Sequence, residues 1–298
     1  MPATHTASYT VRHYECDALG HLNNANYVRY MEEAAFNASA AVGYDKARYD
    51  VMGFLWLAHE TEIEYLQPVG YGDSLEVKTW VGDFRRIRSR RMYEFRQAGQ
   101  NGLVARASTD WVYLNAATLR PATIPPEMIA AFVPEGIEQM PPLTPAKAPT
   151  PPTPPPGVFI QRRRVEWRDI DTAGHVNNAV YFNYIEDCAM QAAVAHGWPL
   201  SRARAEGFAP IARQHHITYH NPALLDDEIE ISTFVALHGK ATADRFYNIT
   251  RVSDGLRLAQ AVTRWVWVDL KTGRPIRIPA DYAADFVPSA VSSQMKTL

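Results

Sequence analysis

Two short stretches place an acid, a glycine, a histidine and two asparagines just ahead of a run with helical spacing. The first is DALGHLNNANY, from Asp17 to Tyr27. The second, DTAGHVNNAVY, begins 154 residues later at Asp171 and repeats seven of the eleven letters. A carboxylate at such a place can act as a base or a nucleophile. The first N–H groups of a helix lack intrahelical partners and can stabilise negative charge developing on a substrate oxygen.

Each residue type in these stretches has a chemical role and an ordinary structural alternative. Gly20 and Gly174 lack a side chain, so a substrate can approach the backbone there. The acid could instead only stabilise a turn, and the histidine could be a buried, hydrogen-bonded residue. Asparagine favours helix starts and can also orient water. The candidate catalytic residues of the two stretches are Asp17, His21, Asn24, Asp171, His175 and Asn178. We rank the two acids first, the two histidines second and the two asparagines third.

The two stretches belong to a repeat that runs through nearly the whole chain. At the same offset, Tyr65 matches Tyr219 and Trp111 matches Trp265, with one small compensating shift near Asn101. A chain of 298 residues is long enough for about two domains, each with its own core. We therefore predict a duplicated domain, with copies at residues 8–136 and 158–288.

Residues 137–157 between the copies form a predicted proline-rich linker. Met140–Gly157 contains nine prolines, which exclude a helix and a central strand. An extended polyproline segment of this length spans roughly 50 Å at about 3.1 Å per residue. It could be a strap that lets the copies pack together or a floppy spacer between independent domains, and we favour the strap.

The composition indicates an ordinary globular protein. The chain is 47% hydrophobic and 21% charged, with a formal net charge of −2, so no basic surface indicates nucleic acid. The two cysteines, Cys16 and Cys188, form no CxxC pair, which argues against zinc and disulfides. The histidine-rich RQHHITYHN (Arg213–Asn221) has no matching ligand set in the first copy, so we expect no metal. Without a signal-peptide pattern or a long apolar run, we expect a cytoplasmic protein that does not contact membranes.

Each copy is predicted to contain one long helix followed by strands. In the first copy the helix should run from about Asn24 to Val42, with Gly43 ending it. The second copy should repeat this pattern from Asn177 or Asn178 to Gly197. Downstream, LEVKTWV alternates apolar and polar residues, as a strand does. STDWVYLN is rich in β-branched and aromatic residues, which favour strands. The fold class is therefore α+β, with one central helix wrapped by an antiparallel sheet of about five strands in each copy.

The order of elements and two motifs resemble the hotdog fold, and within it the acyl-CoA thioesterases of the 4-hydroxybenzoyl-CoA thioesterase type, relatives of the acyl-ACP thioesterases. One motif is the D-x-x-G-H-[LV]-N-N-x-x-Y stretch. The other is Y-x-x-P-x-x-x-x-D, at Tyr65 and again at Tyr219. Both occur twice in register. The resemblance implies a tandem hotdog whose copies pair through their sheets as a pseudo-dimer within one chain, which could pair further into a homo-oligomer.

The resemblance also implies an activity, namely hydrolysis of an acyl thioester to a free acid and a thiol in lipid metabolism. Asp17 and Asp171 would be the base or nucleophile, beside an oxyanion hole at the helix start. The substrate would be an acyl-coenzyme A or an acyl-carrier protein, so the coenzyme A or phosphopantetheine belongs to the substrate and no separate cofactor is expected. Leu19 and Ala173 depart from the D-x-N-x-H pattern of the acyl-ACP enzymes, which puts the full plant-type set of residues in doubt.

Further residues are candidates for substrate binding. Tyr27 and Tyr181 should line the core or the acyl pocket. The stretch FRRIRSRRMYEFR (Phe84–Arg96) is rich in arginine, and alternate residues of a strand share one face. Arg88 and Arg90 could therefore form part of a cationic strip that binds the phosphates of the substrate. A solvated sheet face or a subunit contact is the alternative.

Two other functions remain open from the sequence. The fold also carries hydratases and dehydratases of enoyl thioesters, although their usual spacing and a proline in the motif are missing here. A non-catalytic module that binds acyl thioesters is the second alternative. It would be favoured if the acids were lost from both copies, and neither Asp17 nor Asp171 is lost.

Overall fold

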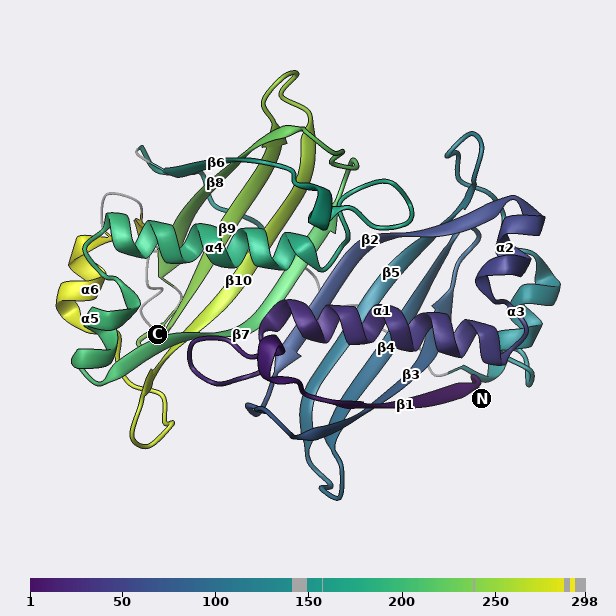
Figure 1. Cartoon of the computed structure of the whole chain (residues 1–298), viewed down its shortest axis with the longest axis horizontal. Helices are drawn as coiled ribbons and strands as arrows, with labels where there is room; N and C mark the ends of the chain where they lie inside the picture. The colour runs from purple at the N-terminus through teal and green to yellow at the C-terminus, as the bar shows by residue number, and fades with distance from the viewer. Residues whose placement is uncertain (141–148, 157, 238, 287–289, 293–298) are drawn as a thin grey trace. The chain divides into compact units, whose positions relative to one another are not determined.

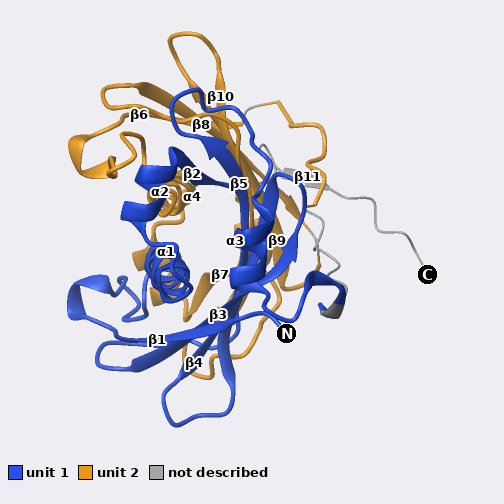
Figure 2. Ribbon diagram, turned by 90° about the vertical axis from the view of Figure 1, so that its right-hand side faces the viewer, with its two compact units in different colours: residues 1–146 blue, residues 147–298 orange. Residues whose placement is uncertain are grey.

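The computed structural model describes residues 1–140, 149–156, 158–237, 239–286 and 290–292. The chain divides into two compact units, residues 1–146 and residues 147–298, which Figure 2 shows in blue and orange. Residues 141–148 and Gly157 of the predicted strap lie outside the described residues.

The first unit is built around one long helix and an antiparallel sheet. The strand order is β1-β3-β4-β5-β2, and every neighbouring pair is antiparallel. In Figures 1 and 2 this sheet curves around α1. Its elements are β1 (Thr4–Thr10), η1 (His13–Glu15), α1 (Asn24–Ala41), α2 (Lys46–Met52), β2 (Phe54–Tyr65), β3 (Ser74–Phe84), β4 (Arg88–Gln97), β5 (Leu103–Asn115), α3 (Pro126–Phe132) and η2 (Ile137–Gln139).

The second unit repeats this order of elements. Its strands run β7-β10-β9-β8, and the free edge of β8 pairs with β6 (antiparallel) and with β11 (parallel). Its elements are β6 (Phe159–Arg164), η3 (Trp167–Asp169), α4 (Val180–Ala195), α5 (Leu200–Ala205), β7 (Phe208–Tyr219), β8 (Glu228–Leu237), β9 (Thr242–Arg251), β10 (Arg257–Asp269), α6 (Ala280–Asp285) and β11 (Ala290–Ser292).

The long helix α1 buries the face that its sequence pattern predicts. Tyr27, Met31, Ala34 and Ala38 are buried and recur at helical spacing. The small alanines allow the sheet to approach the helix closely. The helix ends where predicted, because Gly43 follows the C-cap with a φ of +83°, a left-handed conformation that glycine adopts without strain.

The helix α4 starts later than predicted. We expected it to begin at Asn177 or Asn178, but regular helix begins at Val180. The residues before it form a turn in which the N–H of Val180 donates to the carbonyl of Asn177 over 3.0 Å. The first turn therefore exists, but its hydrogen bonds are not yet those of an α-helix.

The short helices of each unit were missed by the sequence pattern. In the first unit α3 begins with Pro126 at a first-turn position, where proline costs no hydrogen bond. Its residues Met128 and Phe132 pack into a cluster with Tyr44 and Tyr113 at the end of α1. A helix of this length has too few turns to show a period and is held by such tertiary packing.

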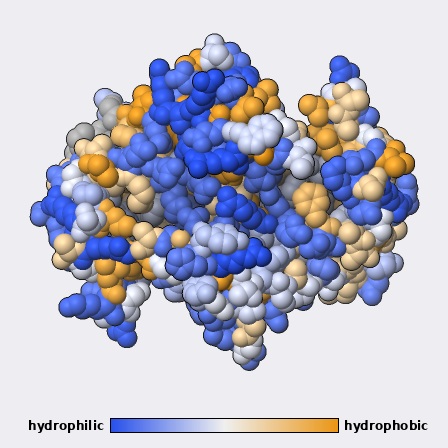
Figure 3. Space-filling view, viewed as in Figure 1, coloured by the Kyte–Doolittle hydropathy of each residue, from blue (hydrophilic) through white to orange (hydrophobic). Residues whose placement is uncertain are grey.

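The described helices give no sign of a membrane span, since none is long and apolar enough to cross one. Figure 3 shows hydrophilic and hydrophobic side chains interspersed on the surface in view.

Candidate active site

Asp17 lies in a tight loop that leads directly into α1. The loop is closed by an isolated bridge between Cys16 and Leu22, and the N–H of Asp17 donates to the carbonyl of His21 over 2.7 Å. Gly20 turns the chain with a φ of +83°, and its N–H donates to the carbonyl of Asp17 over 3.0 Å. A methyl group at Gly20 would meet no atom within 4 Å, so the space above this turn is open. Approach of a substrate to the backbone at Gly20 stays a prediction.

The second unit builds the same loop. Ile170 and Val176 form its bridge, and the N–H of Asp171 donates to the carbonyl of His175 over 3.0 Å. Gly174 has a φ of +80° and open space around it. The two predicted sites therefore share one backbone design.

Each catalytic candidate carboxylate is oriented by backbone N–H groups of its own loop. Oδ1 of Asp17 accepts from the N–H of Leu19 over 2.8 Å and from the N–H of His21 over 3.0 Å. Oδ1 of Asp171 accepts from the N–H of Ala173 over 2.8 Å. Through these bonds the acid stabilises its turn, which was the structural alternative to a catalytic role. They hold the carboxylate in a fixed direction, so the two roles are compatible.

The ring of the histidine in the second loop has a backbone contact at one nitrogen. Nδ1 of His175 lies 3.2 Å from the carbonyl oxygen of Val176. Nε2 is buried and has no hydrogen-bond partner among the described residues. If Nδ1 carries the proton and donates to Val176, Nε2 presents its lone pair. In the first unit, His21 is half-buried and its backbone forms an isolated bridge with Gly70.

The asparagine pair divides into a cap and a candidate for chemistry. Oδ1 of Asn23 accepts from the N–H of Ala25 over 3.0 Å, which makes Asn23 the N-cap of α1. In the second unit Oδ1 of Asn177 accepts from the N–H of Ala179 over 2.9 Å. This bond lies in the turn before α4, whose N-cap is Ala179, without a side-chain cap. The predicted catalytic residues Asn24 and Asn178 therefore do not cap the helices. At the start of α1 the N–H of Ala25 is taken by Asn23 and is not a donor for a substrate oxygen.

This division predicts different outcomes for two neighbouring substitutions. Asn23→Ala should lower the free energy of unfolding by about 1 kcal/mol, since it removes a helix cap. Asn24→Ala should cost less stability and act mainly on catalysis. Urea unfolding of both variants tests the assignment. A larger loss of stability in Asn24→Ala than in Asn23→Ala would contradict it.

The tyrosine of the downstream motif braces the helix start. The hydroxyl of Tyr65 donates to the carbonyl of Asn24 over 3.5 Å, and that of Tyr219 donates to Asn178 over 3.1 Å. The rings of Tyr27 and Tyr65 pack edge to face at 5.1 Å. Burial, with the nearby negative charges of Asp17 and Asp73, raises the pKa of Tyr27, which therefore stays neutral. Tyr27 and its counterpart Tyr181 are both buried, with 3% of each exposed.

The aspartate of the downstream motif holds the loop against which the Asp17 loop packs. Oδ2 of Asp73 accepts from the N–H of Gly70 over 2.8 Å. The N–H of Leu22 donates to the carbonyl of Val69 over 2.7 Å. A methyl group on Gly70 would lie 3.1 Å from the carbonyl oxygen of Gly20, so the two loops are in close contact. The second motif thus supports the first, which explains their occurrence together.

Cys16 precedes the acid of the first loop but is not an activated nucleophile. Partial burial, with the charges of Asp17 and Glu15, raises the pKa of its thiol. Only a thiolate is a strong nucleophile, so the carboxylate is the better candidate in this loop.

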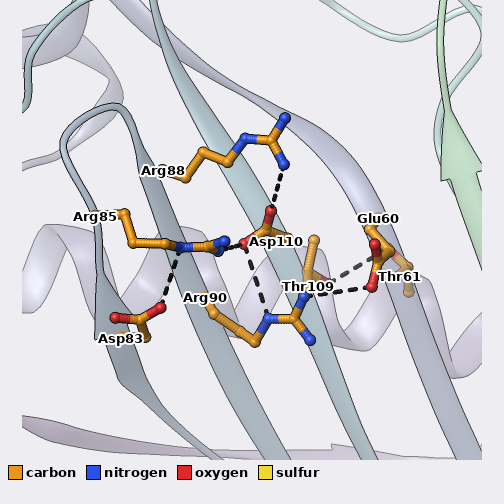
Figure 4. Close-up of polar contacts among 8 residues, drawn as sticks. All are labelled: Glu60, Thr61, Asp83, Arg85, Arg88, Arg90, Thr109 and Asp110. Atoms are coloured by element: carbon orange, nitrogen blue, oxygen red, sulfur yellow. Dashed lines mark hydrogen bonds and ion pairs between the residues drawn. The ribbon is translucent and has the colours of Figure 1, made fainter. Parts of the chain in front are cut away.

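The predicted cationic strip is a cluster of ion pairs (Figure 4). Nη1 of Arg88 lies 3.2 Å from Asp110, and Nη2 of Arg90 lies 3.3 Å from Glu60. Nε of Arg90 is 3.8 Å from Asp110, and Arg85 also contacts Asp110. The side chain of Asp110 is only 2% exposed. Carboxylates therefore balance these arginines, and phosphate binding by Arg88 and Arg90 stays a prediction.

The second unit keeps one of these ion pairs with the charges exchanged. Arg90 on β4 stands opposite Asp110 on β5, whereas Asp244 on β9 stands opposite Arg264 on β10. Arg264 binds Asp244 through two bonds of 2.8 and 2.9 Å. The exchange preserves the pair while altering both residues, which is the pattern expected of a structural contact.

The histidines of β7 lie in the core. His215 and His216 are 1% and 4% exposed, and Nδ1 of His215 is 2.8 Å from Oγ1 of Thr263. Its ring packs edge to face on Phe182 at 5.3 Å. Among the described residues no group of three or more His, Cys, Asp or Glu side chains could hold a metal ion.

Burial of His215 predicts an acid sensitivity of the fold. It lowers the pKa of His215 to about 3, whereas the unfolded chain has the ordinary value near 6.5. Between these values the unfolded state binds a proton that the folded state excludes. The contribution of His215 to the free energy of unfolding is therefore constant above about pH 6.5. Below that pH it falls by roughly 1.4 kcal/mol per pH unit, down to the pKa of the folded state.

The matched substitution is His215→Thr, because Thr61 occupies the same position of the first unit. Urea unfolding of both proteins at several pH values isolates this contribution. The variant should show a shallower loss of stability between pH 6 and about pH 4. Equal slopes for the two proteins would contradict a buried neutral histidine.

Solved structures similar to this chain define its fold. An acyl-ACP thioesterase from Bacteroides thetaiotaomicron is 17% identical, with a TM-score of 0.68, covering 88% of this chain and 97% of its own. A 12:0-ACP thioesterase from Umbellularia californica is 18% identical, with a TM-score of 0.68, covering 92% of this chain and 94% of its own. The fold is the hotdog fold in a tandem double repeat, with a large antiparallel sheet and few helices, as predicted.

The chain belongs to the Thioesterase-like superfamily, whose model matches residues 11–132 and again residues 165–286. The predicted resemblance is thereby confirmed for both copies. Among curated relatives, an acyl-[acyl-carrier-protein] hydrolase of Cuphea viscosissima is 20% identical over 266 residues, which cover 87% of this chain. A palmitoyl-acyl carrier protein thioesterase of Cuphea hookeriana matches to the same extent. The chain spans 61% of the length of each of these two relatives.

Proposed function

We propose that this protein is an acyl thioesterase, which hydrolyses the thioester of an acyl-coenzyme A or acyl-carrier protein to a free acid and a thiol. The observation that carries the proposal is the loop of Asp17, built again around Asp171, which holds an oriented carboxylate just ahead of a long helix in the chain. Membership of the Thioesterase-like superfamily supports the reaction type. The family relatives named above act on acyl-carrier proteins.

In the proposed reaction the thioester carbonyl lies at the helix start, in the open space above Gly20 or Gly174. The carboxylate of Asp17 or Asp171 takes a proton from water, whose oxygen attacks the carbonyl carbon. Alternatively the carboxylate attacks that carbon itself and water then releases the acid. In both routes the carbon–sulfur bond breaks, and the proton taken from water finally passes to the leaving thiolate.

The other predicted residues receive supporting roles in this proposal. His21 and His175 stay predicted catalytic residues, with Nε2 of His175 buried in this structure. The side-chain amides of Asn24 and Asn178 would orient the thioester or the water, since Asn23 caps α1 and Asn177 bonds the turn before α4. N–H groups of the helix start not taken by the caps would stabilise the oxyanion.

The substrate-binding assignments follow from the same placement. Tyr27 and Tyr181 would contribute to the wall beside the acyl chain. Arg88 and Arg90 would meet the substrate phosphate only by sharing the charge that now balances Asp110 and Glu60. Each long helix, α1 or α4, is proposed to be the central helix of its hotdog copy, and the pairing of the copies through their sheets stays a prediction. The coenzyme A or phosphopantetheine is part of the substrate, so the proposal needs no separate cofactor.

An enoyl-coenzyme A substrate separates the proposal from the hydratase alternative. A thioesterase converts it to the enoic acid and free coenzyme A, which a thiol reagent detects. A hydratase adds water across the double bond, leaves the thioester intact and releases no thiol. Mass analysis of the product after incubation with the whole chain shows which bond has reacted. A hydroxyacyl thioester as the product would overturn the proposal.

A further inference from the structure

A buried carboxylate stands two residues before each candidate catalytic acid and has no part in the proposed chemistry. Glu15 is 8% exposed and Asp169 is 7% exposed. They occupy equivalent positions of the two copies, at the ends of the short helices η1 and η3. Buried carboxylates require hydrogen-bond donors, because an unpaired buried charge is strongly unfavourable.

Both carboxylates receive the same two donors. Oε2 of Glu15 accepts from the hydroxyl of Tyr30 on α1 over 2.7 Å and from the N–H of Arg12 over 2.8 Å. In the second unit, Oδ2 of Asp169 accepts from the hydroxyl of Tyr184 on α4 over 2.7 Å. It also accepts from a backbone N–H, over 2.9 Å. The bond from tyrosine to carboxylate therefore survives the change from glutamate to aspartate.

Each tyrosine is itself held by the first strand of its unit. The rings of Tyr9 on β1 and Tyr30 stack at 4.5 Å with an angle of 5° between their planes. In the second unit the guanidinium of Arg163, on β6, covers the ring of Tyr184 at 4.0 Å. Burial and the adjacent carboxylate raise the pKa of both tyrosines, which therefore remain protonated donors.

The backbone of the same residue closes the base of the acid's loop. The carbonyl of Glu15 accepts from the N–H of the cap residue Asn23 over 2.9 Å and from the side-chain amide of Asn26 over 2.8 Å. The carbonyl of Asp169 accepts from the N–H of Asn177 over 2.9 Å. One residue thus makes two attachments. Its carbonyl binds Asn23 or Asn177 at the base of the loop, and its carboxylate binds the tyrosine seven residues further along the chain.

We propose that Glu15 with Tyr30, and Asp169 with Tyr184, are positioning residues that fix the Asp17 and Asp171 loops to the start of the long helix. Each pair is called a clamp below. Without the clamp the loop keeps its internal bonds but loses one of its attachments to α1 or α4. A carboxylate and a set of N–H donors must keep a fixed separation for catalysis, and a displacement of about 1 Å can cost about 10²-fold in rate. The predicted effect of the clamp on the rate rests on the proposed function.

The test removes one oxygen atom from each clamp. Tyr30→Phe combined with Tyr184→Phe should lower kcat for thioester hydrolysis by about 10- to 100-fold, while KM changes less than threefold. The matched control is Tyr9→Phe, which removes a hydroxyl from the ring stacked on Tyr30 without touching Glu15. It should leave kcat unchanged. Glu15→Gln combined with Asp169→Asn keeps an acceptor oxygen and should retain more activity than Glu15→Leu combined with Asp169→Leu.

A purely structural role is distinguished by measuring kcat well below the unfolding temperature of every variant. If the tyrosine variant is fully folded and its kcat equals that of the wild type, the clamp has no positioning role. If kcat falls only as the folded fraction falls, the role is structural and the proposal is overturned.

Hydrogen exchange tests the clamp independently of activity. In Tyr30→Phe the N–H groups of Leu19 and His21 should exchange at least tenfold faster, while β3 and β4 stay protected. Unchanged exchange in this loop would overturn the proposal. A wild type that releases no thiol, together with faster loop exchange in the variant, would instead refute the proposed function and leave the clamp standing.

Discussion

Replacing both Asp17 and Asp171 by asparagine is expected to lower the rate of thioester hydrolysis by about 10²–10⁴-fold, the contribution of a positioned base. Asparagine keeps the shape of aspartate, and its Oδ1 can still accept from the backbone N–H groups that orient Asp17. The loop should therefore survive while the basic or nucleophilic oxygen is lost. Thiol release under substrate saturation measures the effect.

The single substitutions show which copy works. If only one site is active, Asp17→Asn or Asp171→Asn alone will reproduce the full loss. The matched control is Asp50→Asn, which removes an exposed carboxylate of α2 that pairs with Lys46 over 2.7 Å. It should leave the rate unchanged. A double variant with wild-type kcat would show that neither acid takes part in the chemistry.

Asp110→Asn is expected to give the largest loss of stability, about 3 kcal/mol, because one partner of a buried ion pair is removed and the other charge stays behind. Asp110 is contacted by Arg85, Arg88 and Arg90, and the side chain of Arg90 is only 6% exposed. After the loss of this negative charge, Asp83 still pairs with Arg85 and Glu60 still pairs with Arg90. The three arginines then share fewer negative charges. Urea unfolding of the full chain measures the change.

The control lies in the same cluster. Asp83→Asn removes a carboxylate that is 31% exposed and lies 3.1 Å from Arg85. It should cost less than about 1 kcal/mol, as exposed ion pairs do. Similar losses for Asp83→Asn and Asp110→Asn would show that burial is not what makes Asp110 important.

The exchanged pair of the second unit provides a further check on this account. Asp244→Arg or Arg264→Asp alone places like charges opposite each other on β9 and β10. The two substitutions together recreate the arrangement of the first unit and should recover much of the lost stability. No recovery in the double variant would mean that the surroundings, rather than the pair, fix the charges.

Local signals in the sequence were strong enough to predict the parts of the site that lie close together in the chain. The acid, glycine and helix start of the first copy fall within Asp17–Tyr27, and Gly43 marks the end of α1 because a left-handed residue is needed there. Because the domain is duplicated, each of these motifs occurs twice in the sequence. The motif that contains Tyr65 was recognised in the sequence. Its hydrogen bond to the helix start was seen only in the structure.

Partners that come from distant strands were not predictable from spacing. Arg88 and Arg90 suggested a cationic strip, because strand periodicity assigns side chains to a face without identifying what stands opposite. Asp110, which neutralises them, lies on the next strand. The clamp was also missed, because Glu15 and Tyr30 lie on different elements and the candidate catalytic loop separates them in the chain. The repeat alignment held a signal for it, because Tyr30 matches Tyr184 and Glu15 matches another acid, Asp169.

We propose that this chain cleaves acyl thioesters with the acids of its two helix-start loops. The most direct measurement is thiol release from short, long and aromatic acyl-coenzyme A substrates and from acyl-carrier protein, with wild type and the Asp17→Asn, Asp171→Asn double variant side by side. The predicted result is one thiol and one free acid per substrate consumed by the wild type, and near-complete loss in the double variant. Binding of these thioesters by the wild type without any release of thiol would contradict the claim.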